Sequence, residues 1–180
     1  MDRRINKTIM AIDNAFIDLL KKYNFEKITV KMICEKADIE RRTFYLHFQN
    51  KYDLLKYLIC KQMKKFKNDY PKQKNNDKTV IDFYLMVLNF YDKNHLIIYN
   101  IYQGRGSFII RKEIQSIFID YLQKRYGVAS DQIIIMFCAA GISRIFEAYI
   151  NNKITEDKKV IAENIVKIIK KIKPLINNPS

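Results

Sequence analysis

The sequence predicts an all-α protein of about nine helices, in which an N-terminal three-helix unit is followed by a C-terminal helical bundle. Apolar residues recur at spacings of three and four along almost the whole chain of 180 residues, which is the periodicity of amphipathic helices. Glycine occurs only four times and proline only three times, so few positions interrupt this pattern. With 48% hydrophobic and 29% charged residues, the chain has the balance of a globular protein with its own apolar core.

The first predicted helix covers residues 3–23, and its apolar face ends where Asn24 and Phe25 break the period. A second, short helix follows Thr29, which is a good N-cap residue. This helix is too short to be stable alone and needs tertiary packing. Six residues form the predicted apolar face of the first helix: Ile5, Ile9, Ile12, Phe16, Leu19 and Tyr23.

The third and fourth helices are predicted on either side of a short break. The third is short, follows Asp38 and Ile39, and runs to Phe48. Asn50 is expected to cap the fourth helix, and Asp53, three residues on, resembles the second member of a capping box.

A polar stretch with one proline and no apolar residue, residues 71–78, is the clearest boundary in the chain. We therefore predict a helix-turn-helix unit over residues 1–51, which continues into a connecting helix over 51–69, and a second unit over 70–180. Glycines and an Asn–Asn pair separate the helices predicted for this second unit, which cover residues 79–93, 95–102, 107–126, 130–152 and 155–172.

Two short helices with a tight turn between them, braced by longer helices, predict the helix-turn-helix motif of DNA-binding proteins. On the third helix, Phe44 and Phe48 share one side and are expected to pack inward, because successive residues rotate by about 100°. Side chains on its outer side and flanks, with the start of the fourth helix, are then placed to meet bases and phosphates. These are Arg42, Thr43, Leu46, Tyr45, His47 and Lys51.

Each of these positions also has a structural alternative. Arg41 and Arg42 could be an ordinary solvated basic pair, His47 a packing histidine and Tyr45 a core aromatic. The net charge of +14 favours a polyanionic partner, but residues 1–51 hold 11 basic and seven acidic residues, which leaves +10 for the rest of the chain. The charge is therefore not concentrated on the segment predicted to bind DNA.

The segments Ile28–Cys34 and Arg41–Leu55 closely resemble the signature of the TetR/AcrR family of transcription regulators. Together with the residues between them, they cover a short N-terminal part of the chain. The resemblance implies a homeodomain-like DNA-binding unit, a C-terminal unit that binds a small-molecule effector, and a homodimer on a palindromic operator. The C-terminal part is loosely similar to a low-GC bacterial branch of the family, some of whose members activate transcription.

Carried over by position, the family's DNA contacts fall on nine residues of this chain. Two departures from the usual pattern matter. Asp38 replaces the turn glycine, although aspartate tolerates the left-handed conformation better than most residues. Glu40 takes a position often held by a small hydroxyl residue, which puts the base contacts in question. The nine expected DNA-contacting residues are Thr29, Glu40, Arg41, Arg42, Thr43, Tyr45, Leu46, His47 and Lys51.

The second unit is expected to hold the effector site and the dimer interface. Helices 130–152 and 155–172 carry apolar stripes that predict a four-helix interface between two subunits, although the same stripes could simply close the core of one subunit. Ligand sites between helices are mostly apolar, so a few aromatic residues are candidates for the effector pocket. These are Tyr84, Tyr91, Tyr99, Tyr102, Phe108 and Phe118.

The sequence gives little support to catalysis. The chain has two histidines and none of the nucleophile-elbow, P-loop or metalloprotease motifs, and its three cysteines lack metal-ligand spacing. We expect no enzyme activity, no cofactor and no metal. With no signal segment and no uncharged apolar run near the roughly 18 residues of a membrane span, we also expect a cytoplasmic protein without membrane contact.

These observations lead to one main hypothesis and two alternatives. The hypothesis is a repressor that binds a double-stranded DNA operator as a homodimer and responds to an unknown small-molecule effector. The first alternative is an activator of the same family. The second is a helical small-molecule-binding protein or enzyme whose helix-turn-helix is only a packing unit.

Overall fold

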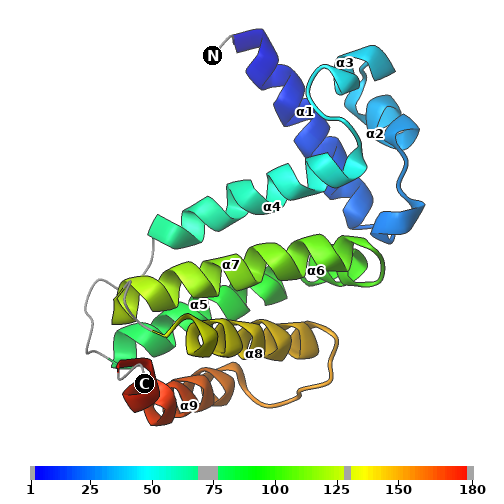
Figure 1. Cartoon of the computed structure of the whole chain (residues 1–180). Helices are drawn as coiled ribbons and strands as arrows, with labels where there is room; N and C mark the ends of the chain where they lie inside the picture. The colour runs from blue at the N-terminus through cyan, green and yellow to red at the C-terminus, as the bar shows by residue number, and fades with distance from the viewer. Residues whose placement is uncertain (1–2, 69–76, 128–130, 178–180) are drawn as a thin grey trace. The chain divides into compact units, whose positions relative to one another are not determined.

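The computed structural model describes residues 3–68, 77–127 and 131–177. Within these ranges the chain forms nine α-helices and a short 3-10 helix, and no strand is present (Figure 1). The prediction of an all-α fold is therefore confirmed. The boundary predicted at residues 71–78 falls mostly outside the described residues.

The helices of the described chain follow the predicted order, with ends that shift by a few residues. Helix α1 stops at Leu20, so Tyr23 lies outside it and is exposed, as is Ile5 near the start of the helix. The α-helices are α1 Arg3–Leu20, α2 Val30–Ala37, α3 Arg41–Tyr45, α4 Lys51–Asn68, α5 Asp77–Lys93, α6 His95–Tyr102, α7 Gly106–Tyr126, α8 Gln132–Ile150 and α9 Lys158–Asn177, and the 3-10 helix η1 is Phe25–Lys27.

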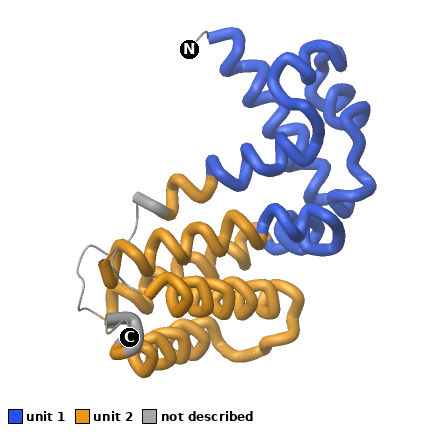
Figure 2. The backbone as a smooth tube through the Cα atoms, viewed as in Figure 1, with its two compact units in different colours: residues 1–61, 95–110 blue, residues 62–94, 111–180 orange. Residues whose placement is uncertain are grey.

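The chain divides into two compact units, which Figure 2 colours separately. Unit 1 contains residues 1–61 and 95–110, and unit 2 contains residues 62–94 and 111–180. Helix α6 therefore belongs with the N-terminal helices although it lies far along the chain. The functional division at residue 70 stays a prediction.

Unit 1 is built around α1, which contacts both α2 and α6. Ile12, Phe16 and Leu20 are buried on its inner face, and the Asn100 side chain of α6 donates to the Leu20 carbonyl at 2.8 Å. Asp13 is also buried and pairs with Lys61 of α4 at 2.7 Å. This ion pair ties α4 to α1, because a buried carboxylate needs a charged or hydrogen-bonding partner.

Unit 2 is a helical bundle in which α9 packs on both α5 and α8. Its core is aromatic, with Phe118 and Phe146 stacked at 5.4 Å and Tyr84 and Tyr91 fully buried beside them. By length and composition alone α8 could cross a membrane, since its mean hydropathy reaches 1.8. Its inner face packs in the unit, however, and Glu147 on that face forms ion pairs with two arginines.

Candidate nucleic-acid interface

The helix-turn-helix of unit 1 is formed by α2, a tight turn and α3 (Figure 1). Thr29 caps α2 as predicted, because its hydroxyl oxygen accepts from the Met32 amide at 3.2 Å. Asp38 ends α2 in the left-handed conformation, with φ 52° and ψ 52°. The expectation that aspartate can replace the turn glycine is confirmed.

Helix α3 is shorter than predicted. It has five residues and ends at Tyr45 rather than at Phe48. The backbone tightens after Tyr45, where the His47 amide donates to the carbonyl of Phe44, three residues back, at 3.0 Å. The sequence period could not reveal this end, because Phe44 and Phe48 point the same way whether or not the last turn is regular.

Phe44 and Phe48 anchor α3 in the core of unit 1, as the sequence predicted. Phe44 is completely buried and Phe48 is 5% exposed. Their ring centroids lie 5.8 Å apart, and Phe48 also contacts Tyr57 of α4 at 5.3 Å. Aromatic contacts at these distances stabilise the packing beyond simple area burial. The orientation of α3 is therefore fixed by its inner side.

The outer side of α3 is open to solvent. Tyr45 is 55% exposed and Leu46 is 74% exposed, which is a much larger exposed fraction than such large side chains usually have. Glu40, Arg41 and Arg42 are also exposed, while Thr43 and His47 are partly buried. The alternative that Tyr45 is a core aromatic is wrong. We call the surface of Glu40–His47 that faces solvent the α3 edge.

The two arginines of the α3 edge are not engaged in ion pairs within the part of the chain that the structure describes, so they can bind a partner. Within the described ranges neither Arg41 nor Arg42 forms an ion pair with a carboxylate of the chain. An arginine fork can donate two parallel hydrogen bonds to guanine or to a phosphate. The edge thus offers positive charge and fixed donors, with Glu40 as its one acidic side chain.

Helix α4 begins beside this edge with the predicted cap. The Asn50 side-chain oxygen accepts from the amides of Tyr52 at 2.9 Å and Asp53 at 3.0 Å. The Asp53 carboxylate in turn accepts from the Gln49 amide at 3.1 Å. This reciprocal arrangement satisfies the first turn of α4 and holds the end of the α3 segment to the start of α4.

Lys51 has an internal role that the sequence did not reveal. Its ammonium donates to three backbone carbonyls, those of Phe25 at 3.0 Å, Glu26 at 3.0 Å and Ile28 at 2.9 Å. Burial lowers the pKa of Lys51, and the charge of Glu26 acts in the opposite direction. Because an ammonium has three donors and all are used, we leave Lys51 out of the proposed DNA surface.

Because of these three hydrogen bonds, we expect Lys51 to stabilise the folded state. Lys51→Met keeps most of the side-chain length but removes the hydrogen-bond donor of three backbone carbonyls. We therefore expect a loss of about 1–2 kcal/mol in the free energy of unfolding. Lys56→Met, at an exposed position of the same helix, is the matched control and should change little. Urea unfolding would measure both. Equal stability of the two variants would contradict the internal role of Lys51.

Glu26 is a second residue that sequence reasoning missed. One of its carboxylate oxygens accepts from the Arg105 amide at 2.6 Å, and the other lies 3.4 Å from the Tyr52 hydroxyl. The turn between α6 and α7 is thereby fastened to η1 within unit 1. No local signal could reveal a contact between residues so far apart in the sequence.

The six aromatic residues considered for an effector pocket do not line one cavity. Tyr99, Tyr102 and Phe108 belong to unit 1, where Phe108 is 68% exposed and Tyr102 is buried. Tyr91 and Phe118 of unit 2 line a small apolar cavity between α4, α5 and α7. Tyr84 lines a different cavity between α5, α7 and α9.

Comparison with known proteins finds a family model that matches the helix-turn-helix segment. The model described as "Bacterial regulatory proteins, tetR family" matches residues 14–58, which include α2, α3 and the first part of α4. An uncharacterized HTH-type transcriptional regulator of Bacillus subtilis, YxbF, is 42% identical over 60 residues, 33% of this chain and 16% of that protein.

A second relative matches a longer stretch. The dhaKLM operon activator DhaS of Lactococcus lactis is 30% identical over 118 residues, 62% of this chain and 54% of the relative. The matches to these curated relatives thus span about half or less of their lengths.

Solved structures extend the likeness in fold to almost the whole chain. The dihydroxyacetone kinase operon activator DhaS superposes with a TM-score of 0.64 at 23% identity, over 95% of this chain and 98% of that one. A TetR regulator from Streptococcus agalactiae gives a TM-score of 0.67, also at 23% identity, over 93% and 96%. The match to the tetR family of bacterial regulatory proteins itself covers residues 14–58, the segment that holds the helix-turn-helix.

Proposed function

We propose that the protein is a DNA-binding transcription regulator whose α3 edge enters the major groove of an operator. The observation that carries this proposal is the exposed outer side of α3, with two arginines free of ion pairs within the described residues, on a helix anchored by Phe44 and Phe48. A recognition helix needs this division, because its inner side fixes its direction and its outer side reads the bases.

The residues of the α3 edge take different roles in this proposal. Arg42 and Thr43 read base edges, Arg41 and Glu40 lie next to them, and Leu46 offers an apolar contact to a thymine methyl group. Tyr45 and His47 meet the phosphate backbones on either side, and Thr29 contributes at the start of α2. The protein acts by binding rather than catalysis, and we infer a cytoplasmic location with access to DNA.

We further propose a homodimer formed by α8 and α9 of two subunits. On α8, Ile133, Met136 and Phe137 are 80%, 59% and 72% exposed, at the three- and four-residue spacing of one helix face. On α9, Val160 and Ile168 are 43% and 50% exposed. Exposed apolar residues in such a stripe are typical of a protein interface.

Gly141 favours a second copy of the chain as the partner that covers this face of α8. It lies on the same side of α8 as Phe137, and a Cβ added to it would meet no atom within 4 Å beyond its chain neighbours and the backbone of its own helix. Gly141 is therefore not needed for packing within one subunit, whereas small residues allow close approach of a partner helix. A twofold dimer would present two α3 edges to a palindromic operator, with centres one helical turn of about 34–36 Å apart.

The direction of regulation follows from where the operator lies relative to the promoter. We propose repression that is relieved by an effector, since an effector with different affinities for the two states shifts their populations. Activation is the second candidate, because the relative DhaS is named as an operon activator. In vitro transcription from the promoter next to the protein's own gene, measured with and without the purified protein, would distinguish repression from activation.

The proposed base contacts can be tested by titration. We expect Arg42→Ala to lower the preference for the operator over random DNA by about 5- to 150-fold, since one bidentate base contact contributes about 1–3 kcal/mol of discrimination. Thr43→Ala should have a smaller effect in the same direction. Fluorescence anisotropy at fixed salt would measure both, with the operator first selected from random duplexes by the wild-type protein.

Lys112→Ala, at an exposed position on α7 in unit 2, is the control for a general loss of positive charge. It should leave the preference unchanged. If neither α3 variant alters discrimination while both remain folded, the α3 edge is not the reading surface.

A further inference from the structure

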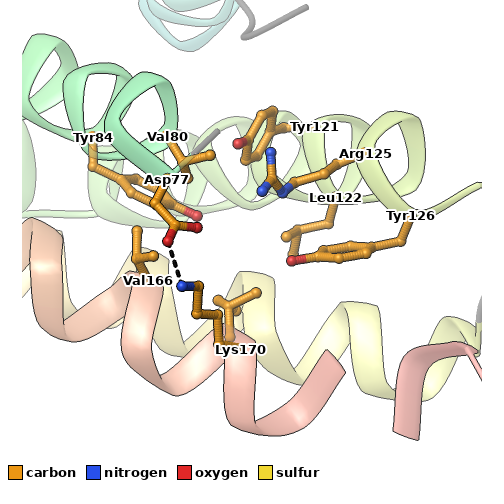
Figure 3. A pocket seen from close by; sticks show the side chains of 10 residues that line it. Asp77, Val80, Tyr84, Tyr121, Leu122, Arg125, Tyr126, Val166 and Lys170 are labelled. Atoms are coloured by element: carbon orange, nitrogen blue, oxygen red, sulfur yellow. Dashed lines mark hydrogen bonds and ion pairs between the residues drawn. The ribbon is translucent and has the colours of Figure 1, made fainter. Parts of the chain in front are cut away.

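A small cavity in unit 2 brings together an unusual set of polar side chains. It lies between α5, α7 and α9 and is lined in part by Asp77, Tyr84, Tyr121, Arg125, Tyr126 and Lys170 (Figure 3). Its volume is about 20 Å³, which is the space of about one ordered water molecule. Lys170 is exposed, so the cavity reaches the surface beside it.

The charges of this cavity do not balance. Lys170 and Asp77 form an ion pair and neutralise each other. Arg125 has no carboxylate partner within the described ranges, and its hydrogen-bonding neighbours are the hydroxyls of Tyr121 and Tyr126. Its Nη1 atom is buried, and no described residue accepts a hydrogen bond from it. A buried guanidinium nitrogen without an acceptor is costly, so Nη1 points to a missing partner of Arg125.

The tyrosine hydroxyls around Arg125 add further donors. Burial raises the pKa of Tyr84 well above its usual value and that of Tyr121 to about 12. Both hydroxyls therefore stay protonated at neutral pH. Figure 3 shows the Arg125 guanidinium and the rings of Tyr84 and Tyr126 reaching toward the same space from two helices. The cavity is thus rich in donors, and its one carboxylate is already paired.

We propose that this cavity is an oxyanion site, in which Arg125 pairs with the carboxylate or phosphate head group of a small ligand. The volume admits only an oxygen of the head group, so the body of the ligand lies toward the exposed Lys170 side. An uncharged ligand of the same shape gains no ion pair with Arg125. The identification of this ligand as the effector rests on the function proposed above, whereas the site itself does not.

Binding by the full chain without DNA tests the site directly. Benzoate is the probe, benzamide is its uncharged counterpart of similar shape, and inorganic phosphate at matched ionic strength distinguishes a phosphate site from a carboxylate site. We expect saturable binding of benzoate or phosphate by calorimetry, with a rise in melting temperature, and no such effect of benzamide. Equal stabilisation by benzoate and benzamide, or no saturable binding of either anion, would overturn the proposal.

Arg125→Gln removes the charge and keeps a hydrogen-bonding side chain. We expect it to weaken anion binding at least about tenfold, because a hydrogen bond between two charged groups is among the strongest in proteins. Lys124→Gln, the adjacent exposed position, is the matched control and should bind as the wild type does. Arg125→Lys retains the charge and should keep part of the affinity, which separates loss of the site from loss of folding. Wild-type affinity in a folded Arg125→Gln variant would overturn the proposal.

A parallel DNA titration separates this inference from the proposed function. If the anion binds but operator affinity stays the same, the oxyanion site stands and its role as effector site is wrong. If the protein without ligand fails to prefer any DNA sequence, the proposed function is wrong and the site still stands.

Discussion

Phe44→Ala is expected to cost about 3–5 kcal/mol of the free energy of unfolding of unit 1, the range measured for large-to-small changes of buried aromatic residues. The Phe44 side chain is 0% exposed, and its ring touches those of Tyr45 and Phe48. Truncation leaves a cavity under a five-residue helix that cannot persist without its anchor. DNA binding should be lost with the fold of α3.

Leu46→Ala is the matched control for Phe44→Ala. Leu46 follows α3 directly but is 74% exposed, so its truncation should change stability by less than about 0.5 kcal/mol. Because the chain has two compact units, hydrogen exchange read by mass spectrometry is the suitable measurement, and it should localise the loss in residues 25–61. Similar exchange in the two variants would show that Phe44 does not anchor α3.

Phe137→Glu is expected to dissociate the proposed dimer. The Phe137 side chain is 72% exposed in the subunit, so the substitution should leave the subunit folded. In the dimer it would replace a buried aromatic contact with an unpaired charge. The loss of about 2–4 kcal/mol typical of an interface hot spot corresponds to a dissociation constant raised roughly 30- to 1000-fold. Operator affinity should fall as well, because a monomer can occupy only one half-site.

Phe108→Glu provides the control for this experiment. Phe108 is also a strongly exposed phenylalanine, at 68%, but it lies at the start of α7 in unit 1. Sedimentation velocity at micromolar concentration should show a dimer for the wild type and for this variant, and a monomer for Phe137→Glu. A dimeric Phe137→Glu protein would place the subunit interface elsewhere.

The local architecture of the helix-turn-helix could be predicted from the sequence. Thr29 and Asn50 act as caps because a side-chain oxygen at that position reaches amides only two or three residues away. Phe44 and Phe48 are buried because their spacing puts them on one side of the chain. Each of these features depends on contacts within a few residues, and such contacts are encoded by residue type and spacing.

The roles of Lys51, Glu26 and Arg125 were decided only by the tertiary structure. The sequence placed Lys51 where a phosphate could meet it, yet its ammonium binds carbonyls more than 20 residues away. Glu26 meets the Arg105 amide 79 residues further on, and Arg125 lines a cavity with residues of α5 and α9. A side-chain period fixes which face of a helix is buried, but the partners of a polar group on that face depend on how distant segments pack.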